Sequence, residues 1–341
     1  MTVRCLESIS QSSKLKAQSE IVVVDNGSED DSVRIINEFS GLMSLKEKKS
    51  QPVNSLTRNR SIIKLIQNKE NLGYAEGNNV GIRYALDNGA DYVCLLNNDT
   101  RVSEDFLSEL VKVAESDKKI GVVGGKIYFE KGYEFHKERY KPADLGKVIW
   151  YAGGLIDWQN VYAGHRGVDE VDHGQYDLLA SHASSHPFGS EPQVIGSEVA
   201  QTQGGRRLAR LGMETEYVNG CLMLVKREVL EKVGVFDPKF FMYLEDTDFC
   251  QRAKKAGFKI FYAPKALIWH LNAGSSGPGS NLHDYFITRN RLLFGLRWAP
   301  LKAKIALIKE SVKFLIKGRK WQKIGVRDFW LGRFGKGSWN A

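Results

Sequence analysis

Short hydrophobic runs alternate with polar and helix-like stretches through the first 130 residues of the chain. The runs lie at residues 21–24, 61–68, 92–96 and 121–129. Those at 21–24 and 92–96 lack polar alternation, which is typical of strands covered on both faces of a parallel sheet. Between the runs we expect helices at residues 33–39, within 71–89 and at 104–115, because capping or glycine residues bound each stretch. Strands alternating with helices predict an α/β fold with a doubly wound sheet.

The pattern changes after the fourth run. Residues from about 130 to 212 are rich in Gly, His, Ser, Gln and charged residues and show weak periodicity, so we expect a partly irregular insertion there. Regular patterning returns with a strand and a helix within residues 216–237, a helix after residue 244, and one or two strands within 259–271. The Gly/Ser-rich residues 272–281 predict a flexible loop.

A basic helical extension, residues 281–341, is predicted to follow a main domain at residues 1–280. Within residues 301–317, apolar positions recur every three or four residues and lysines flank them. The apolar positions are Leu301, Ile305, Ile308, Val312 and Leu315, and the lysines are Lys302, Lys304, Lys309, Lys313 and Lys317. Such a helix either lies on a membrane surface or packs on the domain core with its lysines in water. Trp321, Trp330 and Trp339 favour the membrane.

Composition and charge limit the classes of partner that the protein could bind. The 341 residues, 42% hydrophobic and 26% charged, can bury one large α/β core or two smaller ones. No apolar run approaches a membrane span and no signal peptide is recognisable. The four scattered cysteines predict reduced core residues in the cytoplasm. The net charge of +9 gathers in the tail, with fourteen Lys and Arg from Arg289 onward against Glu310 and Asp328. Anionic lipid or nucleic acid could bind this positively charged tail, but no nucleic-acid recognition motif is present.

Three consecutive polar residues, Asn97, Asn98 and Asp99, end the run at residues 92–96. A hard cation such as Mg²⁺ or Mn²⁺ prefers oxygen ligands, which Asp99 and the amide of Asn97 could supply, directly or through a water. Ligands bind at the carboxyl ends of strands in doubly wound sheets, so we expect Asp25 to share this edge. The same three residues also make a good solvated turn, and both interpretations stay open.

A second acidic group, Glu245, Asp246 and Asp248, follows the aromatic residues 240–243. Aromatic neighbours can desolvate a carboxylate and raise its pKa towards that of a useful base. Acidic residues at a helix start also cap it and pair with its dipole. The two interpretations are compatible, with Asp248 structural and Asp246 facing a cleft.

The histidines and the glycine-rich segment are weaker candidates. His270, between an apolar strand and a loop, could be a third metal ligand, although a lone histidine is more often structural. Five other histidines lack metal-ligand spacing and are predicted at the surface or in loops: His136, His165, His173, His182 and His186. The segment NLGYAEGNNVG fits neither dinucleotide-binding nor P-loop patterns. Its glycines, spaced by four, indicate close helix packing, while Asn71, Asn78 and Asn79 could bind a nucleotide.

Seven motifs occur in order between residues 21 and 295: VVVDNGSEDDS, NLGYAEGNNVGI, YVCLLNNDT, VNGCLMLVKREVLEKVGVFD, FFMYLEDTDFCQRAKKAGF, IWHLNAGSS and YFITRNRLLF. The chain thereby resembles the inverting family 2 glycosyltransferases, in particular the rhamnosyltransferase-like enzymes of cell-surface polysaccharide synthesis. The resemblance implies the GT-A fold, a Rossmann-like mixed sheet flanked by helices. That family normally begins with a strand of the type VSIIIVxYN before the helix that TVRCLESIS resembles, so we expect the first strand to be missing here.

The resemblance also implies roles for individual residues. Asp246 matches the acid of the family's ED motif, the catalytic base. Asp99 matches the last acid of a DxD-type metal motif, Asn97 stands where many members have the first acid, and His270 matches a late histidine that ligates the metal in some relatives. Asp25 matches an acid that contacts the nucleotide base. The remaining nucleotide-sugar-binding candidates are Asn26, Asn71, Gly73, Asn78, Asn98, Gly220 and Glu245.

The activity implied is an inverting, Mn²⁺- or Mg²⁺-dependent sugar transfer. Asp246 would deprotonate an acceptor hydroxyl, which displaces the nucleoside diphosphate in one step while the metal stabilises the leaving charge. The expected donor is a dTDP-, UDP- or GDP-sugar, with rhamnose among the candidates, and the acceptor a polyprenyl-linked or other cell-envelope glycan. The basic C-terminal helices would hold the protein on the cytoplasmic face of an anionic membrane. The alternative is a non-catalytic subunit that binds nucleotide-sugar or glycan there.

Overall fold

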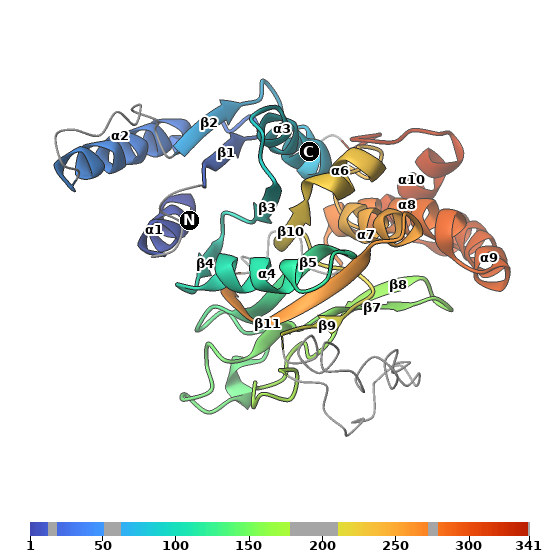
Figure 1. Cartoon of the computed structure of the whole chain (residues 1–341). Coiled ribbons are helices and arrows are strands. Elements are labelled where there is room, and N and C mark those ends of the chain that lie inside the picture. Colours follow the sequence, from blue (N-terminus) through green and yellow to red (C-terminus); the bar gives the residue numbers. More distant parts are fainter. Residues whose placement is uncertain (13–18, 51–62, 178–210, 272–278, 340–341) are drawn as a thin grey trace.

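The hydrophobic runs form strands in two different sheets (Figure 1). The computed structural model describes residues 1–12, 19–50, 63–177, 211–271 and 279–339. His182, His186 and most of the Gly/Ser-rich stretch at 272–281 lie outside these ranges. β1 (Ile21–Asp25) pairs in parallel with β2 (Ile63–Gln67), and neither pairs with another described strand. Because β1 stands outside the main sheet, its residues 21–24 are only half-buried.

The main sheet is mixed, with the strand order β3–β10–β5–β11–β4. Its strands are β3 (Tyr92–Leu96), β10 (Leu222–Lys226), β5 (Ile120–Phe129), β11 (Lys259–His270) and β4 (Thr100–Val102), with the short β6 (Ile149–Tyr151) and β9 (Met213–Glu214) paired to β5 and β11. β5 and β11 are parallel, whereas β10 runs antiparallel to β3 and β5. The prediction that Asp25 and Asp99 share one sheet edge is wrong, because they follow strands of different sheets.

Close packing explains two features of the central pair. All of β5 is buried, as its apolar sequence predicts, and a Cβ at Gly125 would lie 2.3 Å from the carbonyl oxygen of Ala266 in β11. The register of this pair shifts between Ala263 and Leu267, where Pro264 has no N–H to donate. The site described below lies at the end of β11 beyond this shift.

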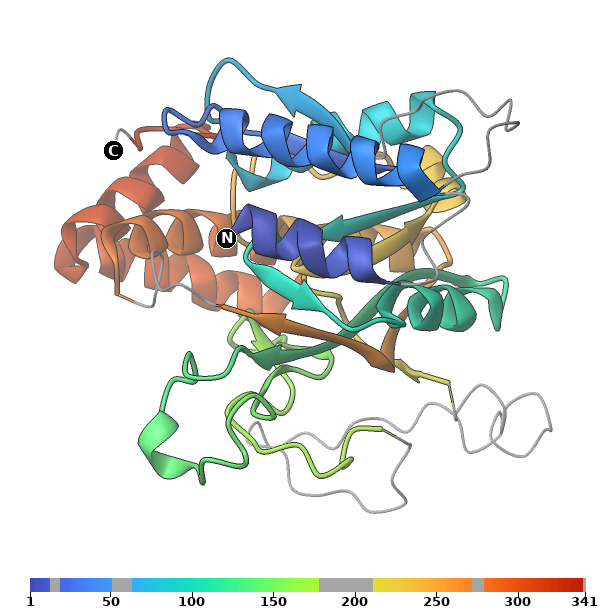
Figure 2. The ribbon, with the colours of Figure 1, turned by 90° about the vertical axis from the view of Figure 1, so that its left-hand side faces the viewer.

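Helices flank both sheets (Figures 1 and 2). They are α1 (Thr2–Gln11), α2 (Ser32–Ser50), α3 (Gly73–Asp87), α4 (Phe106–Glu115), α6 (Arg227–Val233) and α7 (Glu245–Lys255). α4 packs on β5 and β11, and α1 contacts both β4 and α2, so α1 connects the main sheet with the layer of β1 and β2. α2 continues eleven residues beyond the predicted end at Phe39, and the glycine-rich segment lies largely within α3.

The predicted insertion is more ordered than expected over its described part, which ends at residue 177. It contains the 3₁₀ turn η1 (Lys137–Arg139), β6, and the hairpin β7 (Gly154–Asp157)–β8 (Tyr162–His165). Lys126, buried in β5, lies 2.7 Å from the carboxylate of Asp172 and also pairs with Asp177. This buried ammonium fixes the end of the described segment against the sheet.

Three C-terminal helices stand beside the sheet: α8 (Asn281–Trp298), α9 (Leu301–Lys317) and α10 (Lys320–Trp330). Trp321 and Trp339 are half-buried and pack around Tyr285 and Phe286, which accounts for these two side chains without a membrane. None of the helices in the described ranges is long and apolar enough to cross a bilayer. All four cysteines are free thiols, and three are buried.

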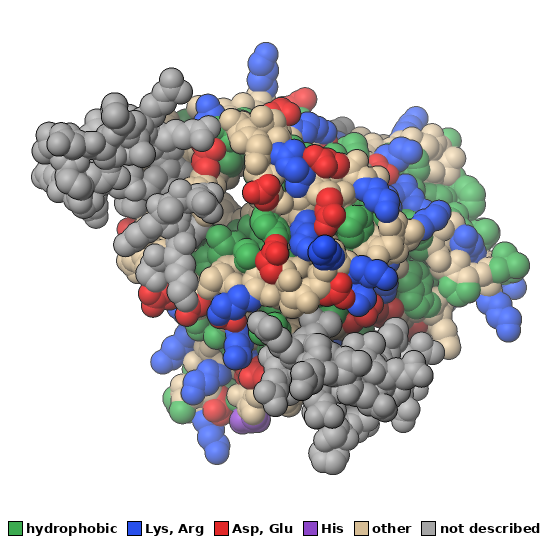
Figure 3. All heavy atoms as spheres, viewed as in Figure 1, with side chains coloured by type: hydrophobic (Ala, Val, Ile, Leu, Met, Phe, Trp, Pro, Cys, Tyr) green, Lys and Arg blue, Asp and Glu red, His purple; other side chains and the backbone are tan. Residues whose placement is uncertain are grey.

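The apolar stripe of α9 faces away from the protein. Its members Leu301, Ile305, Ile308, Val312 and Leu315 are all exposed. The opposite face, with Ala303, Leu307 and Ser311, packs against α8 and α10. The stripe therefore does not contribute to the domain core. Figure 3 shows hydrophobic and basic side chains intermingled on the side of the molecule where Figure 1 places α9.

Candidate active site

Strand pairing brings Asp99 and His270 together. Thr100 of β4 lies opposite His270 at the end of β11, so the preceding Asp99 is next to the imidazole. Nε2 of His270 lies 3.1 Å from Oδ2 of Asp99. The backbone N–H of Leu271 also donates to the carbonyl oxygen of Asp99 at 3.0 Å. The pair is thus fixed by backbone pairing, with the histidine buried and the carboxylate partly open.

The donor set of this pair fits a divalent cation. One carboxylate and one imidazole are common ligands, and such metals usually complete their coordination with substrate phosphates and water. The buried Nδ1 of His270 has no hydrogen-bond partner in the part of the chain that the structure describes, so the ring is oriented through Nε2 and by Trp150, whose ring centre is 4.8 Å away. No third His, Cys, Asp or Glu joins the pair within the described ranges. The protein would therefore supply two ligands.

The other two members of the polar trio point elsewhere. Oδ1 of Asn97 accepts a hydrogen bond from the hydroxyl of Tyr74 at 3.2 Å, and Nδ2 of Asn98 donates to Oγ1 of Thr2 at 2.9 Å. Both side chains thereby hold the turn between β3 and β4 in place. Asp99 is the member of the trio that His270 contacts.

Asp246 is buried in the first turn of α7. The backbone N–H of Gly220 donates to its Oδ2 at 2.9 Å, and the N–H and hydroxyl of Thr247 donate to Oδ1 at 2.6 and 3.1 Å. Burial raises the pKa of Asp246, although these hydrogen bonds act in the opposite direction. The carboxylate is thus oriented from the turn before β10 while retaining free lone-pair capacity on Oδ2.

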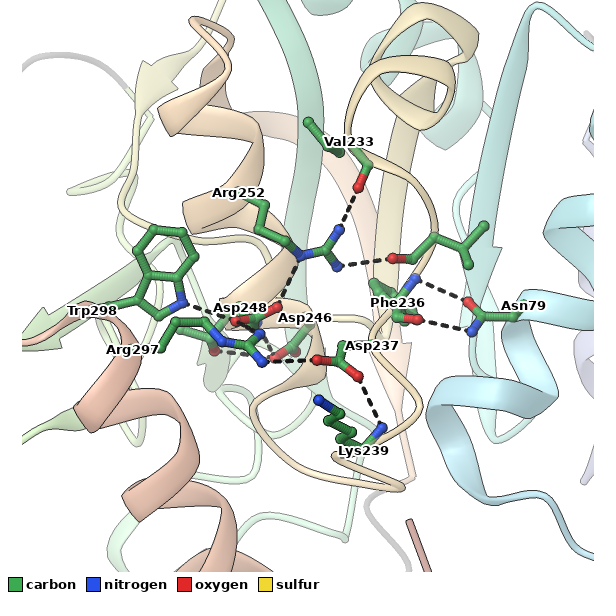
Figure 4. A network of polar contacts seen from close by, with 12 residues as sticks. Asn79, Val233, Phe236, Asp237, Lys239, Asp246, Asp248, Arg252, Arg297 and Trp298 are labelled. Atoms are coloured by element: carbon green, nitrogen blue, oxygen red, sulfur yellow. Dashed lines mark hydrogen bonds and ion pairs between the residues drawn. The ribbon is translucent and has the colours of Figure 1, made fainter. Parts of the chain in front are cut away.

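Glu245 and Asp248 occupy contrasting environments in the same turn. Glu245 is buried, and its Oε2 has no hydrogen-bond partner among the described residues. Burial together with the charge of Asp246 raises the pKa of Glu245 well above the ordinary value. Asp248 is fully buried but accepts hydrogen bonds from Arg252, Arg297 and Trp298 (Figure 4). This agrees with the interpretation that Asp248 is structural. Within the described residues, Glu245 and Asp246 have no cationic partner.

Tyr74 is a site residue that the sequence interpretation missed. It is the aromatic residue of NLGYAEGNNVG, and its hydroxyl donates to Asn97. Burial raises the pKa of Tyr74, and the charges of Glu245, Asp246 and Asp99 add to the effect, so the phenol stays protonated. A Cβ at Gly220 would lie 2.6 Å from its hydroxyl oxygen. The sequence signal that could have identified Tyr74 is an aromatic residue among the small residues of this segment.

The nucleotide-binding candidates near β1 hold a loop together. Oδ1 of Asn26 accepts from the N–H of Leu72, and its Nδ2 donates to the carbonyl oxygen of Gly73. Gly73 has a φ of +80°, and a Cβ there would lie 2.4 Å from the ring of Phe241, so glycine is required. The other candidates also bond to nearby residues. The carboxylate of Asp25 accepts a hydrogen bond from the N–H of Ser28, and Oδ1 of Asn71 accepts from Asn26 and from the N–H of Gly73. Nδ2 of Asn78 donates to the carbonyl oxygen of Tyr74.

Two further side chains differ from expectation. Asn79 is buried and exchanges two hydrogen bonds with the backbone of Phe236 (Figure 4), so it anchors α3 and does not face a ligand. His165 is packed against Trp150 and Tyr151, and burial lowers its pKa to about 4. His165 lies in strand β8 and is half-buried, so it is not in a loop, whereas His136 and His173 are exposed as predicted.

The comparison with protein families identifies the chain. The profile of Glycosyl transferase family 2 matches residues 1–167. The chain belongs to glycosyl transferase family 2. This confirms the family that the sequence motifs predicted, and the relatives below confirm the rhamnosyltransferase-like branch.

Curated relatives within family 2 extend the match. The low-salt glycan biosynthesis hexosyltransferase Agl10 of Haloferax volcanii is 22% identical over 243 residues, which cover 70% of this chain and 62% of Agl10. The N-acetylglucosaminyl-diphospho-decaprenol L-rhamnosyltransferase of Mycobacterium tuberculosis is 41% identical over 68 residues, 19% of this chain and 22% of the relative. The chain spans less than two thirds of the length of either relative.

A solved structure confirms the fold. GalNAc-T7, crystallised with UDP, GalNAc and Mn²⁺, superposes with a TM-score of 0.52 at 14% identity, covering 97% of this chain and 54% of that protein. The family 2 chain therefore has the predicted GT-A fold, a mixed sheet flanked by helices with further helices at the C-terminal end.

Proposed function

We propose that the chain is an inverting glycosyltransferase that moves a sugar, with rhamnose as the first candidate, from a nucleotide-sugar to a lipid-linked or other cell-surface glycan. The observation that carries the proposal is the placement of two acidic groups beside one tyrosine. The hydroxyl of Tyr74 donates to Asn97, two residues before Asp99, and lies against Gly220, whose N–H donates to Asp246. The names of the relatives, a hexosyltransferase and a rhamnosyltransferase, support this reaction class.

We assign the role of general base to Asp246. Its Oδ2 is held by the N–H of Gly220, and its raised pKa makes it a better proton acceptor than an ordinary aspartate. It takes the proton of an acceptor hydroxyl as that oxygen forms a bond to the anomeric carbon. The bond from this carbon to the nucleoside diphosphate breaks in the same displacement, which inverts the anomeric centre. A single base suffices for this chemistry.

Asp99 and His270 are assigned to the diphosphate end of the donor. A divalent cation such as Mn²⁺ or Mg²⁺, held by these two side chains, would neutralise the charge that develops on the leaving diphosphate. Asn97 and Asn98 keep the turn that carries Asp99 in place through Tyr74 and Thr2. Asp25, at the end of β1, remains the candidate for the nucleotide base.

The test is a transfer assay with dTDP-rhamnose and with UDP- and GDP-hexoses in the presence of Mn²⁺, using a polyprenyl-diphospho-sugar acceptor. We expect one donor to be consumed, with inversion detected by NMR of the product and with loss of transfer in Asp246→Asn. Donor binding without turnover across the panel would instead favour the non-catalytic binding subunit. Activity that Asp246→Asn leaves intact would contradict the role of this carboxylate.

We also propose that the exposed stripe of α9 binds an anionic membrane surface. Leu301 and Val312 of the stripe are 72% and 51% exposed, far more than a packed apolar helix face would be. Lysines flank the stripe, four of them on one side and Lys304 on the other, which matches anionic headgroups beside an apolar interior. This placement would hold the active site near a lipid-linked acceptor. Trp330, 50% exposed at the end of α10, adds an interfacial side chain.

A further inference from the structure

The segment that leads into the catalytic carboxylates has a strained backbone. Phe241, Tyr243 and Leu244 have φ values of 63°, 69° and 70°. Left-handed conformations are costly for residues with a Cβ and persist where the surroundings hold them. We call residues 239–244 the approach loop, because Glu245 and Asp246 follow it directly. Its conformation decides where α7 begins and where both carboxylates lie.

Asn290 of α8 holds the middle of the approach loop. It is fully buried, and its Nδ2 lies within hydrogen-bonding distance of three carbonyl oxygens, those of Phe240 at 2.8 Å, Met242 at 2.7 Å and Tyr243 at 3.0 Å. One amide group thus satisfies carbonyls that the irregular backbone leaves without a helix or sheet partner. A side chain without this donor would take one hydrogen bond away from these loop carbonyls, although the carbonyl oxygen of Phe240 would keep its bond from the N–H of Met242.

Arg289, the preceding residue, holds the start of the same loop. Its guanidinium is fully buried and donates to the carbonyl oxygens of Lys239 at 3.2 Å and Phe240 at 3.0 Å. It also donates to the carbonyl oxygen of Gly335 at 2.7 Å, beyond α10. Burial lowers the pKa of Arg289, which shows the cost of placing the cation there. Its planar fork joins the approach loop to the end of the chain.

The far end of α8 holds α7 from the other side. Arg297 and Trp298 donate to Oδ1 of Asp248, at 2.7 and 2.8 Å, in the first turn of α7 (Figure 4). Glu245 and Asp246 therefore lie between two attachments to one helix. The predicted domain boundary at residue 280 separates α8 from the site that it supports.

We propose that Asn290 and Arg289 are positioning residues: they keep the approach loop in its left-handed conformation and so place the carboxylate of Asp246 for proton transfer. The proposal rests on the function proposed above for Asp246. It gives the RN pair of the motif YFITRNRLLF a defined task. Neither side chain touches substrate in this account, because both act through backbone carbonyl oxygens.

The experiment compares Asn290→Ala and the milder Arg289→Lys with Arg291→Ala. Arg291 is a matched control on the same helix, since it bonds the carbonyl oxygens of Asn160 and Val161 and the carboxylate of Glu310 and not the approach loop. Each protein is measured by hydrogen exchange of residues 239–250 and by transfer kinetics from pH 5 to 9. Exchange reports the loop whether or not a sugar donor has been found.

We expect faster exchange across residues 239–250 in both test variants, relative to the control. We also expect kcat to fall, by roughly a hundredfold in Asn290→Ala, since small misplacements of catalytic groups have effects of this size. The KM for the donor should stay within about twofold, and the acid limb of the pH profile should move, which lost folding alone would not produce. Unchanged exchange in both variants would overturn the proposal. A wild-type protein that transfers no sugar would overturn the proposed function, while exchange would still decide the loop's dependence on α8.

Discussion

The backbone N–H of Gly220 donates a hydrogen bond to Oδ2 of Asp246 over 2.9 Å. Gly220 lies just before β10, and its neighbour Cys221 accepts a hydrogen bond from the N–H of Asn97 at the end of β3. The base and the turn that carries Asp99 are thus attached to adjacent strands of one sheet. Strand pairing thus places Gly220 relative to the turn that carries Asp99, and the approach loop sets the carboxylate of Asp246 against Gly220.

The first prediction separates the two acids of α7. Asp246→Asn should lower kcat by about 10²- to 10⁴-fold, because a positioned base contributes that much. Glu245→Gln should have a smaller effect, since the sequence motif and the Gly220 contact favour Asp246. In the wild type, activity should rise with pH through the raised pKa of Asp246, above the usual aspartate range. Steady-state kinetics across pH provides the measurement, and equal losses in the two variants would contradict the assignment.

The second prediction concerns metal binding. Asp99→Ala and His270→Ala should each weaken Mn²⁺ binding in the presence of a nucleoside diphosphate by at least tenfold, about 1.4 kcal/mol, because each removes one of two protein ligands. The measurement is the shift of Tm during a Mn²⁺ titration. His173→Ala, at an exposed histidine, is the control and should bind as the wild type does. Wild-type affinity in both test variants would remove this pair from the metal site.

The third prediction is a pH-dependent gain in stability. Because the folded pKa of Glu245 is raised, its contribution to stability is complete below the ordinary glutamate pKa and is lost as pH rises through the folded value. Glu245→Gln should therefore be more stable than the wild type at pH 7.5, by roughly 1 kcal/mol or about 2 to 4 °C in Tm. The gain should vanish near pH 4.

Thermal unfolding at both pH values measures this gain. Glu228→Gln, at an exposed glutamate near the start of α6, is the matched control and should change little. A Glu245→Gln variant that is less stable than the wild type at pH 7.5 would show that the carboxylate gains more from its surroundings than burial costs it.

The sequence predicted most elements because local patterns decide them. The apolar runs became β1, β3 and β5, and the acids after residue 244 begin a helix. The family motifs also paired Asp99 with His270, because the order of motifs carries information about a shared fold. These features depend on neighbours in sequence or on a recurrent arrangement.

Features set by long-range packing could not be predicted. Periodicity marks an apolar stripe on α9 but does not say which face meets the protein, and the small residues Ala303 and Ser311 turned out to do so. Likewise, Trp339 packs on the small cluster of Tyr285 and Phe286 only because α10 returns to α8. The role of Asn290 depends on contacts with the backbone near Phe240, 50 positions away, for which the chain offers no local signal. The role of Tyr74 depends on a contact 23 positions away, and an aromatic residue amid small ones marks it only weakly.

The fourth prediction tests Asp248. Asp248→Ala should destabilise the protein by about 3–5 kcal/mol, because it leaves Arg252 and Arg297 without their shared buried carboxylate. Asp31→Ala breaks an exposed pair with Arg34 and should cost no more than about 1 kcal/mol. Urea unfolding of the two variants gives the comparison. Similar losses would mean that the network of Figure 4 contributes little to folding.

The last prediction concerns the exposed stripe of α9. Binding to vesicles that contain anionic lipid should weaken in a variant with Lys302, Lys309 and Lys313 changed to glutamine, by up to about 1 kcal/mol for each lysine. Binding should also weaken in the double variant that carries Ile305→Ser and Val312→Ser, which removes apolar area but keeps the charge. Changing the exposed Lys137 and Lys141 of the insertion to glutamine serves as the control and should have little effect.

Salt dependence distinguishes the two contributions. In a vesicle co-sedimentation assay, raising the ionic strength should weaken binding of the wild type and of the serine variant, because screening acts on the lysines that both retain. The glutamine variant should respond less to salt and keep its dependence on apolar burial. If the serine variant binds as tightly as the wild type, the stripe does not enter the lipid, and the lysines alone account for any attraction to the surface.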